Sequence, residues 1–240
     1  MRILVTGGAG FIGSHVVDAY IQAGHDVLVL DNLVTGKRQH INRDARFEEL
    51  AIQDPLVENV FLDFKPDIVN HHAAHINLRQ SVIDPMFDAE NNILGSLNLL
   101  KASVRSGVRK IIFASTGGAI YGDPDTNPVS ESCEPLPLSP YGASKLAIEH
   151  YIRIWRHIHG LDYTVFRYPN VYGPRQDPKG EAGVVAIFSI QIRQGIHPRI
   201  FGDGSKTRDY LFIDDLVKAN LLALDGGSCQ TLNLGWGRDF

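Results

Sequence analysis

The sequence lacks several features that would place it in well-defined classes of protein. Its 240 residues include two cysteines, Cys133 and Cys229, too few for a disulfide framework. It has no run of Lys or Arg and a net charge of −4, so the charge pattern of a nucleic-acid or anionic-membrane binder is absent. No apolar run reaches the roughly 18 residues of a membrane-spanning helix, and no signal-peptide pattern precedes the first strand. We therefore expect a cytoplasmic protein with no nucleic-acid or membrane partner.

The overall composition is ordinary for a globular protein. Hydrophobic residues make up 44% of the chain and charged residues 21%. A chain of 240 residues can bury the core of one α/β domain, with or without a smaller substrate-binding part.

The first 31 residues carry the pattern of a dinucleotide-binding unit. A buried β-branched strand at 3–5 leads into Gly7, Gly10 and Gly13, and Phe11 and Ile12 begin an apolar helical pattern that ends at Gly24. Glycines at these positions allow a sharp turn, close approach of the backbone to a pyrophosphate and close packing of helix on strand. The helix N-terminus adds unpaired N–H groups for the phosphate.

An acidic residue completes this unit. Asp31 ends the second buried strand, 18 residues after Gly13, where a carboxylate accepts hydrogen bonds from a ribose diol. The same carboxylate would repel a 2′-phosphate, so the sequence favours NAD over NADP. We also expect cofactor contacts from Phe11 and Ile12 at the start of the helix, and from Asn32 and Tyr168. Asp54 is a further expected contact and, in addition, a candidate N-cap of a helix at 57–64.

Strands alternating with helices along the chain predict a doubly wound, Rossmann-like parallel sheet. After the first two strands we expect strands at 46–51, 66–70, 110–114, 162–167, 208–213 and 231–234. Helices are expected at 57–64, 85–106, 140–159, 182–193 and 214–224, with a short strand at 198–201. Residues 1–168 and 209–240 are predicted to form the NAD-binding domain, and 169–208 a substrate-binding segment rich in Pro and Gly.

Three histidines, His71, His72 and His75, follow the expected fourth strand and raise the question of a metal site. Strand alternation sends His71 and His72 to opposite faces, and no Cys or Glu cluster stands nearby. We therefore predict no metal. The small residues Ala73 and Ala74 are better explained by close passage of the chain beside the cofactor.

A Tyr–Lys pair supplies candidate chemistry. Tyr141 and Lys145 lie four residues apart, and hence on one face of a helix that Ser139-Pro140 should begin. A tyrosine pKa near 10 is too high for a base at neutral pH. A lysine ammonium, a positive nicotinamide ring and a helix N-terminus would all lower it. Thr116 or Ser115, at the end of a neighbouring strand, could bind the same substrate oxygen.

These segments resemble the extended short-chain dehydrogenase/reductase superfamily. The matching stretches are 6–13, 115–122, 141–145, 167–175 and 208–214. Within the superfamily the chain is most similar to the NAD-dependent sugar-nucleotide epimerase/dehydratase family, in particular its UDP-glucose 4-epimerases. The resemblance implies Tyr141 as base, Lys145 as its modulator and a cofactor ligand, and Thr116 as the third catalytic residue. It also implies Asn170 and Arg208 as contacts to the nucleotide of a UDP-hexose substrate, alongside Thr116 and Tyr141.

The reaction type follows from a missing acid. Dehydratases of the family carry an acidic residue just after the Ser/Thr, whereas Gly117, Gly118 and Ala119 cannot transfer a proton. Epimerisation at C4 through a 4-keto intermediate needs no such acid and is the expected reaction. The alternatives are another nucleotide-sugar dehydratase or reductase, and a non-catalytic dinucleotide-sensing protein, which would typically lack the Tyr–Lys pair.

The resemblance carries two further expectations. Members of the family continue well past position 240, so the C-terminal part of the substrate domain is expected to be missing here. Members dimerise through the two helices at 85–106 and 140–159. The second of these shows two apolar stripes, more than one sheet face can cover.

Overall fold

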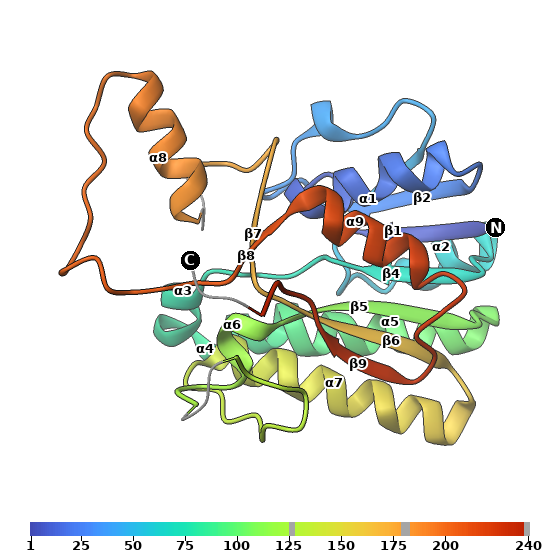
Figure 1. The fold of residues 1–240 in the computed structure, drawn as a ribbon. Coiled ribbons are helices and arrows are strands. Elements are labelled where there is room, and N and C mark those ends of the chain that lie inside the picture. Colours follow the sequence, from blue (N-terminus) through green and yellow to red (C-terminus); the bar gives the residue numbers. More distant parts are fainter. Residues whose placement is uncertain (125–127, 179–182, 238–240) are drawn as a thin grey trace.

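Seven parallel strands form the centre of this computed structural model, which describes residues 1–124, 128–178 and 183–237 (Figure 1). Their order across the sheet is β3-β2-β1-β4-β5-β6-β9, and every neighbouring pair is parallel. The strands are β1 Arg2–Thr6, β2 Asp26–Asp31, β3 Arg46–Glu49, β4 Ile68–His71, β5 Lys110–Thr116, β6 Asp162–Tyr168 and β9 Gln230–Asn233. The order 3-2-1-4-5-6 is that of the doubly wound dinucleotide-binding fold. The predicted fold class is confirmed.

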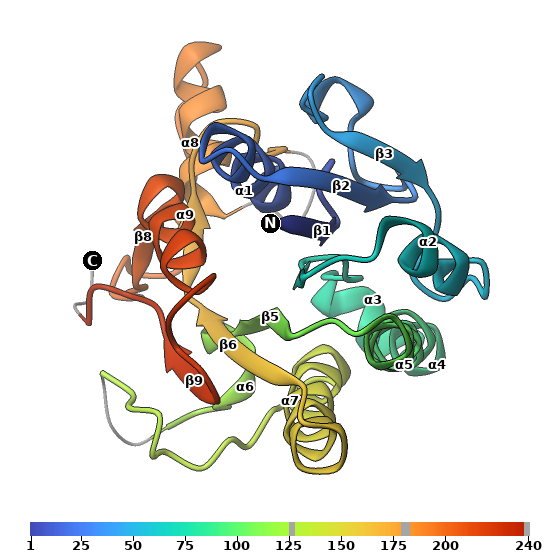
Figure 2. The ribbon, with the colours of Figure 1, turned by 90° about the vertical axis from the view of Figure 1, so that its right-hand side faces the viewer.

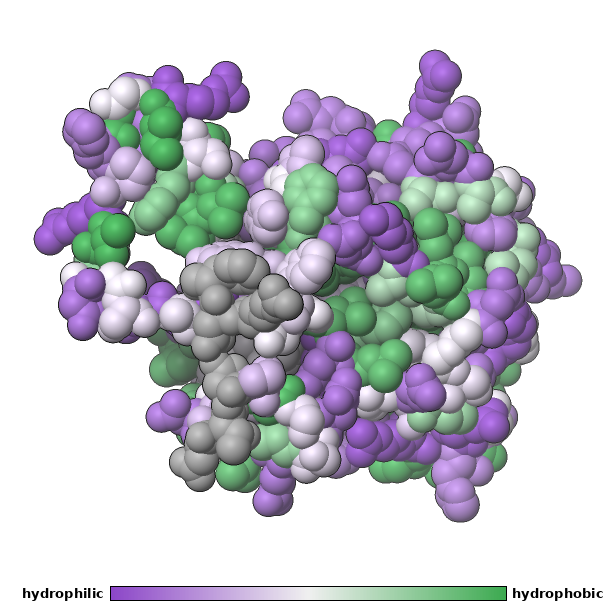
Figure 3. Space-filling view, viewed as in Figure 1, coloured by the Kyte–Doolittle hydropathy of each residue, from purple (hydrophilic) through white to green (hydrophobic). Residues whose placement is uncertain are grey.

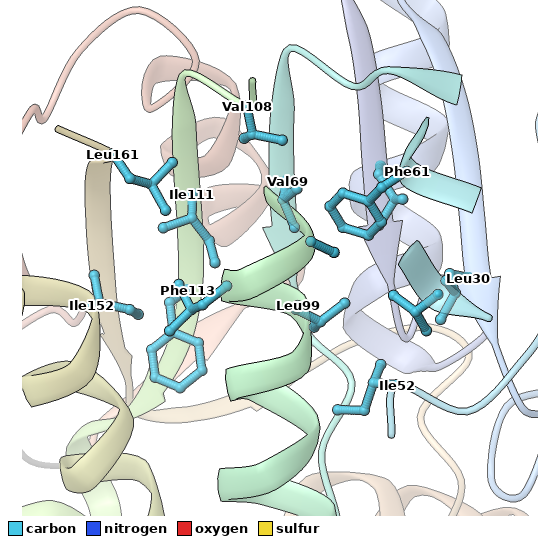
Figure 4. Close-up of a cluster of buried hydrophobic side chains, with 14 of the residues drawn as sticks. Leu30, Ile52, Phe61, Val69, Leu99, Val108, Ile111, Phe113, Ile152 and Leu161 are labelled. Atoms are coloured by element: carbon cyan, nitrogen blue, oxygen red, sulfur yellow. The ribbon is translucent and has the colours of Figure 1, made fainter. Parts of the chain in front are cut away.

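Helices cover both faces of the sheet, as Figure 2 shows from the side. One face packs against α2 Val57–Phe64, α5 Gly95–Ser106 and α7 Pro140–His159, and the other against α1 Phe11–Gln22 and α9 Ile213–Leu222. Alternation within β1 divides the two cores, because Leu4 joins the first cluster while Ile3 and Val5 join the second. Figure 4 shows the first cluster, in which Leu99 on α5 and Ile152 on α7 meet side chains of the sheet.

The helical region before β5 is more divided than the single helix predicted at 85–106. It consists of α3 Leu78–Ile83, α4 Pro85–Ala89, a π-helix at Glu90–Leu94 and then α5. Asn77 and Asp84 cap α3 and α4, accepting hydrogen bonds from the backbone N–H of Gln80 (2.7 Å) and of Phe87 (3.0 Å). A local apolar period does not distinguish a π-turn from an α-turn, so the π-helix could not be predicted from it.

Beyond β6 the chain forms a second, two-stranded parallel sheet. Here β7 Asn170–Tyr172 pairs with β8 Tyr210–Phe212, and α8 Val184–Arg193 projects away from the main body (Figure 1). The helix predicted at 182–193 is found from Val184 onward, and Ala182 lies outside the described residues. The strand predicted at 198–201 is wrong: these residues form no strand, and Ile200 and Phe201 are exposed. Figure 3 shows apolar side chains at the surface of this projecting part.

Two smaller differences concern helix starts. A short helix, α6 Gly117–Ile120, directly follows β5, and α9 begins at Ile213, so Asp214 lies in its first turn and is not its cap. In the described part of the chain, no helix has the combination of length and apolar character that crossing a bilayer requires.

Candidate active site

The glycine turn between β1 and α1 forms a tight cradle at the carboxyl edge of the sheet. Gly7 has φ +69°, and a Cβ there would stand 2.7 Å from the backbone nitrogen of Ala73. A Cβ at Gly13 would stand 2.2 Å from the carbonyl oxygen of Gly7. The N-cap of α1 is Gly10, with no side-chain hydrogen bond, so the N–H groups that begin α1 are open to an anion. The turn therefore fits a pyrophosphate, and glycine is required at position 7 because the backbone after β4 passes close beside it.

Asp31 lies at the end of β2 next to this turn. It is buried, and its carboxylate accepts hydrogen bonds from the backbone N–H of Ala9 (3.0 Å) and of Leu33 (2.8 Å). The two basic residues of the following loop are engaged elsewhere: Lys37 with Asp177 at 2.9 Å, and Arg38 with Glu49. The Asp31 carboxylate would repel the 2′-phosphate of NADP, and Lys37 and Arg38 are both paired with other carboxylates.

Three other residues expected at the cofactor have partners within the chain. The side chain of Asn32 accepts from the N–H of Val34 (3.2 Å), and that of Asp54 from the N–H of Leu56 (2.8 Å). Asp54 therefore shapes the turn before α2, whose N-cap is Leu56. Tyr168 is buried, and its hydroxyl accepts a hydrogen bond from the side-chain amide of Asn220 at 3.0 Å.

The histidines at the end of β4 lie on opposite faces, as predicted. The ring of His71 is hydrogen-bonded to Thr6 Oγ1 (2.7 Å) and Ser96 Oγ (2.9 Å), whereas His72 stacks on Tyr168 with ring centres 6.1 Å apart. Burial, with a contribution from the positive charge of Lys145, lowers the pKa of His72 to about 3. Among the described residues, no group of three or more His, Cys, Asp or Glu side chains is arranged to hold a metal ion.

The Tyr–Lys pair sits on the first turns of α7. Ser139 caps the helix by accepting from the N–H of Gly142 at 3.1 Å, and Pro140 occupies the first turn. A Cβ at Gly142 would stand 2.4 Å from the carbonyl oxygen of Ala119, so α6 is pressed directly against this end of α7. Lys145 is buried, donates to the carbonyl of Ala114 (2.8 Å) and lies over the ring of Phe113.

The protonation of this pair is dominated by burial. Burial, and then the negative charge of Asp88, raise the pKa of Tyr141 above its usual range. Burial lowers the pKa of Lys145 to about 8, and the charges of Asp88 and Glu149 oppose that lowering. The chain alone therefore leaves Tyr141 a neutral phenol at physiological pH, and a base at this position needs positive charge from what binds beside it.

The two candidate hydroxyls at the end of β5 have different surroundings. Ser115 is buried and donates to Glu149 Oε1 at 2.6 Å. Thr116 is the last residue of the strand, is only partly buried and begins the turn into α6. Ser115 is thus tied into the protein interior, while Thr116 lies at the edge where ligands of this fold bind.

A buried ion pair between Glu149 and Arg167 lies next to Ser115 at the end of β5. It was not predicted from the sequence. Glu149 accepts from Arg167 Nε (3.0 Å) and Nη2 (2.7 Å), with side chains 1% and 3% exposed. Arg167 also donates to the hydroxyl of Tyr121 (2.6 Å), which in turn donates to Asn233 (2.7 Å). One signal was available, because Glu149 follows Lys145 by four residues and so shares its helix face.

A cavity of about 360 Å³ opens at the carboxyl ends of β5, β6 and β9. Its lining brings together Asn170 and Arg208, the two residues expected to contact the substrate nucleotide, with Gly117 and Arg167. Arg208 is exposed, and within the chain it donates to the carbonyl of Thr207 at 2.7 Å. The lining does not include Tyr141, whose backbone N–H donates to Ser81 Oγ on α3 (3.3 Å).

A doubly wound sheet with a phosphate-binding turn and a Tyr–Lys helix at the strand ends defines the class of short-chain dehydrogenases/reductases. The family model for the NAD-dependent epimerase/dehydratase family matches residues 3–235. The chain belongs to this family.

Named relatives agree with that assignment. The UDP-glucose 4-epimerase of Mycolicibacterium smegmatis is 45% identical over an alignment of 243 residues, gaps included. The alignment covers 99% of this chain and 78% of that protein. The structure of UDP-glucose 4-epimerase from Thermotoga maritima with UDP-glucose is 51% identical, with a TM-score of 0.98, covering 100% of this chain and 78% of that one. The Thermus thermophilus UDP-glucose 4-epimerase in complex with NAD is 46% identical, with a TM-score of 0.95, covering 100% and 79%.

Proposed function

We propose that the protein is an NAD-dependent isomerase that interconverts UDP-glucose and UDP-galactose by epimerisation at C4 of the sugar. The observation that carries this is the placement of Tyr141 and Lys145 beside the end of β5, next to a cavity that contains Asn170 and Arg208. Longer relatives with the same fold are UDP-glucose 4-epimerases; the structure of one contains UDP-glucose and that of another contains NAD.

The cofactor would be held by residues that already form its cradle. The Gly7–Gly13 turn and the start of α1 fit the pyrophosphate, Asp31 the adenosine ribose, and the chain at Ala73 and Ala74 the nicotinamide half. Asn32, Asp54, Lys145 and Tyr168 are proposed as further contacts. Bound NAD supplies a hydride acceptor and donor that is regenerated within each cycle.

The protein's own residues then manage one proton. Tyr141 takes the proton of the C4 hydroxyl as the sugar is oxidised. It returns the proton after the 4-keto sugar has rotated to present its other face to the cofactor. Lys145, as an ammonium, stabilises the phenolate. We assign the third role to Thr116, which would bind the same sugar oxygen, because Ser115 is committed to Glu149. Asn170 and Arg208 would bind the nucleotide, Arg208 by paired hydrogen bonds to the diphosphate.

The alternatives predict different products. A dehydratase would need a further acid after Thr116, where Gly117, Gly118 and Ala119 stand; a reductase would consume NADH; a dinucleotide sensor would convert nothing. Incubation with UDP-galactose and UDP-glucose separately, with product analysis by NMR and mass spectrometry, decides among them. An epimerase gives the same mixture from both sugars without net NADH. A keto product or accumulated NADH would overturn the proposal.

The assignment of parts of the chain to NAD binding and to substrate binding is also a proposal. We assign residues 1–168 and 209–240 to NAD binding and 169–208 to substrate binding. In support, β9 extends the main sheet beside β6, whereas α8 stands apart from it. The pairing of β7 with β8 would hold the substrate segment at the carboxyl edge of the large sheet.

Asp31 should set cofactor selectivity. Asp31→Ala is expected to weaken NAD binding by about 10- to 100-fold, the loss of hydrogen bonds to a charged acceptor, and to narrow the difference between NAD and NADP. Asp31→Asn is the matched variant, because an amide oxygen can still hold the turn at Ala9. Calorimetric titration of both cofactors tests this, and a wild type that binds NADP as tightly as NAD would contradict it.

We further propose a homodimer formed by the helices at 85–106 and 140–159. Apolar side chains stand exposed on both, among them Met86, Leu94 and Ile158, with a hollow between Met86 and Leu94. Light scattering at micromolar concentration should show a dimer, and Leu94→Glu should give monomers. Leu222→Glu is the control, because Leu222 is equally apolar and exposed but lies on α9, across the sheet. A monomeric wild type would refute the dimer.

A further inference from the structure

A carboxylate that the proposed mechanism does not use lies buried beside the catalytic helix. Asp88, on α4, is 0% exposed. Its Oδ2 accepts from Ser144 Oγ at 2.6 Å and its Oδ1 from Asn92 Nδ2 at 3.0 Å. Within the described ranges, no Lys, Arg or His comes within ion-pair distance of it. A buried charge without a directly contacting cation is costly unless a nearby positive charge balances it.

The hydrogen bond to Ser144 places Asp88 against the reacting part of α7. Ser144 directly precedes Lys145 and lies one turn after Tyr141, on the same side of the helix. The bond therefore holds the turn that carries both catalytic side chains. Its short length is typical of a hydroxyl donating to an ionised carboxylate.

The second hydrogen bond leads to the other wall of the site. Asn92 lies in the π-helix, where its side-chain amide also donates to the carbonyl of His75 (2.9 Å) and its amide oxygen accepts from the N–H of His75 (2.8 Å). The loop after β4 contains Ala73 and Ala74, the expected cofactor contacts. Asp88 thus joins the Tyr–Lys turn to this loop through two buried side chains.

Near Asp88 and Lys145, one other pair of buried charges neutralises itself and two histidine rings are uncharged. The titratable groups of the surrounding elements are Glu149 on α7, Arg167 and Tyr168 on β6, Tyr121 after α6, His71 at the end of β4, and His72 and His75 after it. Glu149 and Arg167 pair with each other. Burial lowers the pKa of His71 and of His72, so both rings are uncharged. Lys145 is the buried cation on the turn that Asp88 holds, and Asp84 and Glu90, on either side of Asp88, are exposed.

We propose that Asp88 is a positioning residue of the active site and the buried counter-charge that keeps Lys145 an ammonium. Its influence on catalysis rests on the proposed epimerase function, but its influence on Lys145 does not. Two consequences follow from one negative charge. It favours the protonated form of Lys145, and it favours the protonated form of Tyr141 as well.

The test is Asp88→Asn, which removes the charge and nearly preserves the shape. An amide there can accept from Asn92 and donate to the Ser144 hydroxyl, so no buried group loses its partner. In the full, NAD-loaded enzyme, the rate should fall on the acid side as Tyr141 becomes protonated and on the alkaline side as Lys145 loses its proton. Without the negative charge both apparent pKa values decrease, so both limbs should move about one pH unit towards acid.

Two variants separate charge from structure. Asp84→Asn removes the same charge from the exposed cap of the same helix and should move neither limb, because an amide caps equally well. Ser144→Ala removes the hydrogen bond and keeps the charge, so kcat should fall with both limbs in place. A purely structural Asp88 would lower kcat in Asp88→Asn without moving either limb.

A second readout is independent of catalysis. NMR titration of carbon-13-labelled lysine side chains in the chain without cofactor, assigned with Lys145→Arg, reports the pKa of Lys145, about 8 in the wild type. This value should fall in Asp88→Asn and stay in Asp84→Asn. If the wild type shows no epimerase activity but the Lys145 pKa falls, the proposed function fails and the counter-charge stands.

The inference is overturned if the Lys145 titration and both limbs of the pH profile are unchanged when the charge of Asp88 is removed. Asp88→Ser provides a second charge-free side chain, smaller than Asn, should the amide disturb folding. If Asp88→Asn and Asp88→Ser both lower the pKa of Lys145, the result supports Asp88 as its counter-charge.

Discussion

Tyr141→Phe is expected to reduce the rate of epimerisation by about 10²–10⁴-fold, the usual contribution of one general acid–base group. The substitution keeps the ring and removes the hydroxyl alone. Ser115 is bound to Glu149, and Gly117, Gly118 and Ala119 carry no side chain that could take a proton. Initial rates of UDP-galactose conversion measure the effect.

Three comparisons define what that loss means. Thr116→Ala should cost less, because it removes one hydrogen bond to the sugar and leaves the base in place. Ser115→Ala should affect stability before rate, since it leaves Glu149 with one donor fewer. NAD affinity by calorimetry should be unchanged in Tyr141→Phe, because the glycine turn and Asp31 are untouched. A Tyr141→Phe enzyme as active as the wild type would refute the assignment of the base.

Local chemistry explains why so much of this site could be predicted from the sequence. The strand–glycine turn–helix unit needs only neighbouring residues, and Gly7 and Gly13 stand where a Cβ would collide with backbone. The cap at Ser139-Pro140 sets the phase of α7 and hence the common face of Tyr141 and Lys145. Predictions of this kind depend on contacts within one turn or one strand, which a sequence displays directly.

The features that were missed depend on contacts between distant parts of the chain. Arg167 meets Glu149 because β6 and α7 pack together, and Asp88 meets Ser144 across 56 positions. Neither pairing leaves a periodic mark in the sequence. The false strand at 198–201 has the opposite cause: Ile200 and Phe201 have strand propensity, but no strand of the described residues pairs with them.

The buried pair under the active-site edge yields the prediction with the largest effect on stability. Arg167→Met should lower the free energy of unfolding by about 3–5 kcal/mol, because it leaves the Glu149 carboxylate buried with Ser115 as its remaining donor. Methionine fills a similar volume, so the loss reports the stranded charge more than a cavity. Urea unfolding with comparison of slopes and midpoints provides the measurement.

The control and the double variant separate charge from packing. Arg46→Met breaks an ion pair of similar length, 3.0 Å to Asp26, but both partners are exposed, so it should cost about 1 kcal/mol or less. Adding Glu149→Gln to Arg167→Met should restore much of the stability, since the buried group is then neutral and its amide can still hold Ser115. An Arg167→Met protein no less stable than Arg46→Met would show that water or a shift of α7 stabilises the unpaired Glu149 charge. The network would then hold the end of β5 without contributing to the stability of the fold.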